Sequence, residues 1–189
     1  GLRACGNAEG RGIIGTKIAD NMLKFRKLTN SVSVYEYYMG NYGNRHRLLP
    51  AADEMHPIYT FYVENEISDS STQIECFNIW NNLLNFYCFG RTAYDTDLSL
   101  EDQIQNIGKL FGKGASYVAE IFRIYEDTNK GDLPLNKASQ QLRETIDAEK
   151  IYSLFDQALD AAMYDATAAN NVRLLRMAFR YTMLDREEV

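Results

Sequence analysis

The stretch SVSVYEYYMG, residues 31–40, decides the fold, because it predicts a β-strand in a chain that otherwise favours helices. Val34 and Tyr35 supply the β-branched and aromatic side chains that strands prefer. Further along, a helix fits the residues from Asp53 to Glu66, and a second short strand fits between Ile67 and Glu75. Strand, helix and strand in this order predict a parallel βαβ unit, whose two strands lie in one sheet.

The ends of the two predicted strands carry polar and aromatic side chains that form a candidate ligand site. Ligands of parallel sheets bind at the carboxyl ends of the strands. That edge would hold Glu36, Tyr37, Tyr38, Gln73 and Glu75. The loop from Gly40 to Arg47 follows the first strand and is longer than most connections, which have about 4–6 residues. It adds four further candidates for ligand binding, Tyr42, Arg45, His46 and Arg47.

Nearly all of the chain after Glu75 has the periodicity of amphipathic helices. Apolar side chains recur at steps of three and four residues from Phe77 to Tyr94, again before Gly112, and from Tyr117 to Thr128. Two last helices follow, and we expect a turn from Asp165 to Asn171 between them. The sequence therefore predicts a predominantly α fold with a small parallel β element.

We expect three parts along the chain. Residues 1–15 are rich in glycine and have no periodicity, which is typical of an irregular arm. Residues 16–95 hold the βα segment, and residues 96–189 form a helical bundle. Ser99 and Asp147 precede apolar periodic runs and are candidate helix N-caps.

Composition and charge narrow the class of protein. The 189 residues are 46% hydrophobic and 24% charged, which is typical of a globular protein. A net charge of −6, with no basic stripe along any predicted element, argues against a nucleic-acid partner. No apolar run approaches the ~20 residues of a membrane span. The three cysteines and two histidines lack the spacing of metal ligands, so we expect neither a metal nor a cofactor.

Several short motifs, taken in order, resemble the closing part of a bacterial glycoside-hydrolase-like family. That family is a domain of unknown function in which a barrel precedes a helical tail, and it is often joined to an α-glucuronidase-like N-terminal domain. The motifs are Val34-Tyr-Glu-Tyr-Tyr38, Leu49-Pro50, Phe61-Tyr-Val-Glu-Asn65, Thr72-Gln73, Phe111-Gly112-Lys-Gly-Ala115, Leu154-Phe-Asp-Gln-Ala158, Asn171-Val-Arg-Leu-Leu-Arg176 and Tyr181. Glu66 stands where the family has a glycine.

The resemblance implies that residues 16–95 are the last βα units of a (β/α) barrel-like domain, followed by a helical bundle. A complete barrel needs eight βα units and about 250 residues. An N-terminal remainder of a longer chain is therefore an expected partner, and this chain alone is expected to be inactive. The resemblance also implies a sugar or glycan ligand and a periplasmic or cell-surface location.

Glycoside hydrolysis normally uses two carboxylates about 5–5.5 Å or about 6.5–9.5 Å apart. Glu36 and Glu75 are the acids expected at adjacent strand ends, where neighbouring strands lie about 4.8 Å apart. They are our candidate catalytic pair. Alternatively, Glu36 binds a sugar hydroxyl or pairs with Arg45 or Arg47, and Glu75 caps the next helix.

Three hypotheses for function remain open at this point, and the third is a purely structural helical adaptor, which predicts a large exposed apolar patch and no tyrosine-lined pocket. In the first, the chain is the C-terminal part of a carbohydrate-active, glycoside-hydrolase-like protein and contributes a sugar-binding rim and a helical tail. Arg45, His46 and Arg47 would then bind the carboxylate of an acidic sugar, because arginine offers a bidentate fork. In the second, it is a non-catalytic helical interaction or glycan-binding module. A purely structural reading of the same loop is that its side chains are simply solvated.

Overall fold

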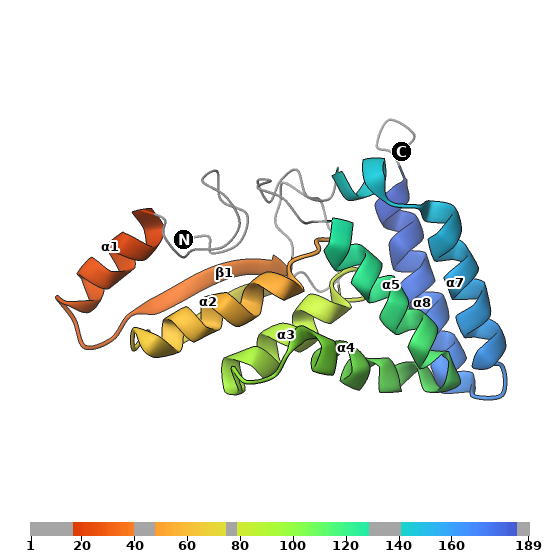
Figure 1. Cartoon of the computed structure of the whole chain (residues 1–189), viewed down its shortest axis with the longest axis horizontal. Coiled ribbons are helices and arrows are strands. Elements are labelled where there is room, and N and C mark those ends of the chain that lie inside the picture. The colour runs from red at the N-terminus through yellow and green to blue at the C-terminus, as the bar shows by residue number, and fades with distance from the viewer. Residues whose placement is uncertain (1–16, 40–47, 75–78, 129–140, 185–189) are drawn as a thin grey trace.

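The computed structural model describes residues 17–39, 48–74, 79–128 and 141–184 of the chain. These residues are mostly helical and contain one small parallel sheet, as the sequence predicts. Figure 1 shows the sheet towards one end of the molecule and a group of C-terminal helices at the other. Shorter helices lie between the two ends.

The sheet and its crossover helix form the predicted βαβ unit. After helix α1 (Lys17–Arg26), strand β1 (Ser33–Met39) leads to α2 (Ala52–Glu64) and then to strand β2 (Asp69–Ile74). The two strands are parallel, with Ser33 opposite Asp69. This arrangement confirms the parallel βαβ unit, and it brings the carboxyl ends of both strands to one edge of the sheet.

A local irregularity shapes the carboxyl end of the sheet. Glu36 pairs with Thr72 and Met39 pairs with Ile74, so β1 uses one residue more than β2 over this stretch. The Thr72 hydroxyl accepts a hydrogen bond from the Tyr38 backbone N–H and donates one to the Glu36 carbonyl, each at 3.2 Å. The side chain thus satisfies backbone groups that the regular ladder would otherwise pair.

The two faces of β1 have different surroundings. Val34, Glu36 and Tyr38 alternate along the strand and are all buried. The ring of Tyr38 packs against Phe89, with ring centroids 6.0 Å apart. Tyr35 projects from the opposite face and is 40% exposed. The side chain of Glu36 therefore lies on the face that the helices cover.

The connection from α2 to β2 passes through a left-handed residue. Glu66 has a φ of 54°, a conformation that favours glycine. The Arg26 guanidinium pairs with the Glu66 carboxylate and donates to its backbone carbonyl at 3.1 Å. Arg26 also donates to the Thr29 carbonyl, so it ties the end of α1 to the end of α2.

Six further helices follow in the described part of the chain, together with the helical residues 141–145. Ser99 caps the second of these helices by accepting from the Asp102 N–H, and Asp147 accepts from the Lys150 N–H. Both predicted N-caps are confirmed. The helices are α3 (Leu83–Tyr94), α4 (Leu100–Gly108), the 3₁₀ helix η2 (Lys109–Gly114), α5 (Ala115–Thr128), α7 (Ala148–Ala161) and α8 (Ala166–Met183).

Two predicted helix boundaries are wrong. Helix α3 begins at Leu83, and residues 79–82 form a turn, in which the Asn82 side chain bonds to the distant Leu49 backbone. The predicted turn from Asp165 to Asn171 is the first part of α8. Asp165 caps that helix by accepting from the Ala168 N–H, and the alanines that follow have the highest helix propensity.

A large hydrophobic core runs through most of the described elements. It contains Val34 and Met55 of the βα unit together with Phe122, Phe155 and Phe179 of α5, α7 and α8. The core is therefore continuous across the boundary between residues 95 and 96. The sheet and the C-terminal helices thus contribute to one connected group of buried residues.

Gly114 is a position where the packing of this core leaves no room for a side chain. A Cβ atom there would lie 2.7 Å from the Ala158 carbonyl oxygen and 3.3 Å from two further backbone atoms of Ala158. We expect Gly114→Ala to lower the free energy of unfolding by about 1–3 kcal/mol, because backbone must shift. Chemical denaturation measures this change.

Gly90→Ala is the matched control, since a Cβ atom at Gly90 in α3 meets nothing within 4 Å. It should raise the free energy of unfolding by about 0.5–1 kcal/mol through helix propensity alone. Equal effects of the two substitutions would show that the contact between η2 and α7 is not tight in solution.

Candidate functional site

The candidate site is the carboxyl end of β1, where the backbone is held by an asparagine of α3. The Asn85 side-chain amide donates to the Tyr38 carbonyl at 2.6 Å and to the Leu49 carbonyl at 2.7 Å. Tyr38 precedes the segment 40–47, and Leu49 follows it. One buried amide thus fixes the chain on both sides of the predicted ligand loop.

Two more side chains hold the residues that follow this loop. The Asn82 Oδ1 atom accepts from the Leu49 backbone N–H at 3.1 Å. The Thr182 hydroxyl of α8 accepts from the Leu48 N–H at 3.0 Å and donates to the Ala178 carbonyl. The last turns of α8 are therefore joined directly to the edge of the site.

Glu36 lies beside this edge but beneath the sheet surface. Its side chain is 0% exposed, and the Tyr62 hydroxyl of α2 donates a hydrogen bond to Glu36 Oε1. The neighbouring Tyr59 shares a hydrogen bond of 2.6 Å with Ser70, and its pKa is raised, first by burial and further by the charges of Glu36 and Asp69. In this position the Glu36 carboxyl links β1 to α2.

Besides Glu36, the structure describes the side chain of Tyr38 but not those of the other predicted site residues. Tyr38 is completely buried in the core. Tyr37 and Gln73 belong to β1 and β2, but their side chains are outside what the structure describes. Because Glu75 lies outside the described residues, the pairing of Glu36 with Glu75 remains a prediction. Five candidates in all lie outside the described residues. These are Tyr42, Arg45, His46, Arg47 and Glu75.

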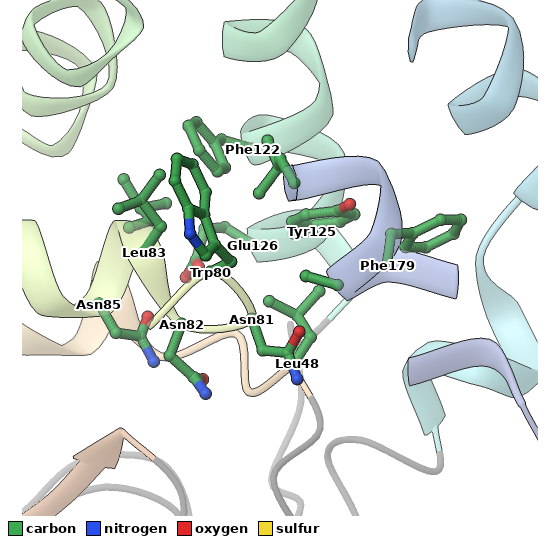
Figure 2. A pocket seen from close by; sticks show the side chains of 13 residues that line it. Leu48, Trp80, Asn81, Asn82, Leu83, Asn85, Phe122, Tyr125, Glu126 and Phe179 are labelled. Atoms are coloured by element: carbon green, nitrogen blue, oxygen red, sulfur yellow. The ribbon is translucent and has the colours of Figure 1, made fainter. Parts of the chain in front are cut away.

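A small hollow lies next to the asparagines, between α3, α5 and α8. Figure 2 shows three asparagines along one edge and Phe122, Tyr125 and Phe179 along the other. Trp80, Glu126 and several aliphatic side chains also line it. The hollow measures about 10 Å³, which is room for about one water molecule. Sugar binding there would require the walls to move apart.

The sequence revealed the asparagines, which interrupt an apolar pattern, but our interpretation missed Glu126. Glu126 follows Phe122 by four residues and lies on the apolar side of α5. A carboxyl group on an apolar helix face is unusual because burial of its charge is costly. Its position on the apolar side of the helix was therefore the sequence pattern that could have identified Glu126.

Comparisons with known proteins identified no relatives: no family model, no curated protein and no solved structure matched the chain. Within the described ranges, no group of three His, Cys, Asp or Glu side chains is placed to hold a metal ion. In the same part of the chain, no helix is long and apolar enough to cross a membrane.

Replacing Asn85 tests its role at the strand end. We expect Asn85→Ala to lower the free energy of unfolding by about 2–4 kcal/mol, because two buried carbonyls lose their donor. The control is Asn106→Ala, which removes a hydrogen bond from Lys109 at the surface and should cost less than about 0.5 kcal/mol. Denaturant titration followed by circular dichroism compares the two variants, and similar losses would contradict the assignment.

The bond between Tyr62 and Glu36 can be tested by removing a single hydroxyl. We expect Tyr62→Phe to lower the free energy of unfolding by about 1.5–3 kcal/mol, because a buried carboxyl loses a donor. Tyr94→Phe is the control, since Tyr94 is almost fully exposed. A Tyr62→Phe variant as stable as the control would mean that Glu36 does not depend on α2.

Proposed function

We propose that this chain is the C-terminal part of a carbohydrate-active, glycoside-hydrolase-like protein. In this proposal β1, α2 and β2 are the last βα units of a barrel-like domain, and the helices from α3 onward form its helical tail. The N-terminal remainder of a longer chain supplies the other units. The observation that carries the proposal is a parallel βαβ unit whose carboxyl end is fixed to the following helices by Asn85.

Three features of the described residues support this assignment. Parallel sheets are usually covered on both faces, whereas Tyr35 on one face of β1 is 40% exposed, which suits a sheet face that other parts of a longer chain cover. Glu66 has a left-handed backbone conformation, and it stands where the family that this chain resembles has a glycine. Asn82, Asn85 and Thr182 hold the residues on either side of the segment 40–47.

The sugar contacts in this proposal come from the edge of the sheet. Tyr37, Gln73 and the segment 40–47 supply them, and Arg45 with Arg47 binds the carboxylate of an acidic sugar. Glu36 acts mainly by holding β1 against α2, because its carboxyl is buried and accepts from Tyr62.

A second candidate function is a non-catalytic glycan-binding or interaction module. The burial of Glu36 favours it, since a catalytic carboxyl must reach its substrate. The two functions differ in what the Glu36→Gln variant does to the longer protein. Loss of turnover with retained binding supports the hydrolase, and unchanged turnover removes Glu36 from the chemistry.

The proposed ligand is tested by binding of uronic-acid-containing oligosaccharides to the longer protein, measured by calorimetry. We expect the double variant Arg45→Ala and Arg47→Ala to weaken binding by about tenfold or more, because it loses charge-assisted hydrogen bonds. Arg91→Ala, an exposed arginine on α3, is the control and should leave the affinity unchanged. Failure of every tested glycan to bind, or equal affinity of both variants, would contradict the proposal.

A further inference from the structure

The first turn of α2 is held by a carboxyl group from a different helix. Ala51, the N-cap residue of α2, provides no side-chain hydrogen bond. Instead, Glu126 Oε2 of α5 accepts from the Asp53 backbone N–H at 3.2 Å. The first N–H groups of a helix have no partner within the helix, so Glu126 takes over part of the role of a cap. This bond joins the βα unit to the C-terminal helices.

Three carboxyl groups meet at this junction. Asp53 and Glu54 come from the first turn of α2, and Glu126 comes from the last turn of α5. Glu54 is 6% exposed and Glu126 is 4% exposed. Charged carboxylates in such a site repel each other and lose their hydration, which makes the fully ionised cluster costly.

Among the described residues, the charged groups that act on the Glu126 carboxyl are Asp53 and Glu54, and both are acidic. From α3 the buried Cys88 thiol faces it, and burial together with the charge of Glu126 raises the Cys88 pKa. Two charged groups of the neighbouring helices are paired on α5: Glu101 of α4 with Arg123, and Lys150 of α7 with Glu120. The remaining neighbours around the hollow are uncharged: Trp80, Asn81 and Asn82, the Tyr125 ring, and Leu175, Ala178 and Phe179 of α8.

We propose that Glu126 is a proton-operated latch between α2 and α5. With its carboxyl neutral, Glu126 accepts the Asp53 N–H and holds the N-terminus of α2 against the C-terminal helices. When it loses its proton, repulsion by Asp53 and Glu54 weakens that contact. The proposal concerns how the two parts of the chain stay together, and it does not depend on the proposed function.

The direction of the pH effect follows from the pKa of Glu126. Burial raises this pKa well above its ordinary 4.5, and the neighbouring Asp53 and Glu54 charges raise it further. The folded chain therefore holds a proton that the unfolded chain releases. The stabilisation is complete at a pH below the pKa of Glu126 in the unfolded chain. It is lost as the pH rises through the pKa of Glu126 in the folded chain. Between the two values, the unfolding equilibrium constant rises by about tenfold per pH unit.

The test compares the wild-type chain with Glu126→Gln, whose amide oxygen can still accept from Asp53 but cannot ionise. We expect the ratio of their unfolding constants to rise with pH between about pH 5 and pH 8, by up to about tenfold per unit. Glu120→Gln, an exposed carboxyl on the same helix, is the control and should give a constant ratio. A constant ratio for Glu126→Gln would overturn the proposal.

A direct measurement on the wild-type chain completes the test. With ¹³C in the glutamate carboxyl groups, the Glu126 carbon should have the chemical shift of a neutral acid at about pH 6, above the ordinary pKa of the group. The shift of an ionised carboxylate at that pH would contradict the latch. A Glu126→Gln chain that does not fold would also contradict it, because that variant imitates the neutral form.

Discussion

The side-chain amide of Asn85 donates to the carbonyls of Tyr38 and Leu49, and the arrangement of the candidate site depends on this bridge. Both carbonyls are away from water, where an unpaired polar group costs free energy. Any rotation of α3 away from the sheet would break both hydrogen bonds together. The carboxyl end of β1 is therefore positioned by the helices that follow it, and not by the two-stranded sheet alone, which would be marginal without further packing.

Other side chains of the helices also bond to the βα unit, and these bonds relate the proposed function to the rest of the fold. Thr182 and Asn82 add bonds from α8 and from the turn before α3, while Glu126 joins α5 to α2. Hydrogen bonds at these places depend on the direction between donor and acceptor, whereas the hydrophobic contacts around them do not. A tail built in this way would hold the edge of a barrel-like domain in place, and this is the role we propose for it. Glu36 then serves as a buried link between strand and helix.

Local patterns predicted the βαβ unit and the caps at Ser99 and Asp147, because these features depend on neighbouring residues. The sequence predicted Glu36 and Tyr38 at the ligand edge, and it did not reveal that both are buried on the face of β1 that the helices cover. The start of α3 could not be predicted, since Asn82 and Asn85 bond to residues more than thirty positions away. The place of Glu126 on the apolar side of α5 could be read from the sequence, but its partner Asp53 could not, because Asp53 belongs to a distant helix.

The central claim is that the strand end and the C-terminal helices unfold together, and native-state hydrogen exchange tests it most directly. The amides of Leu48 and Leu49 report on the bonds to Thr182 and Asn82, and the amide of Phe179 reports on the core of α8. We predict that all three exchange through one opening, with the same free energy and the same dependence on denaturant. Rapid, denaturant-independent exchange at Leu48 and Leu49, while Phe179 stays protected, would contradict the account.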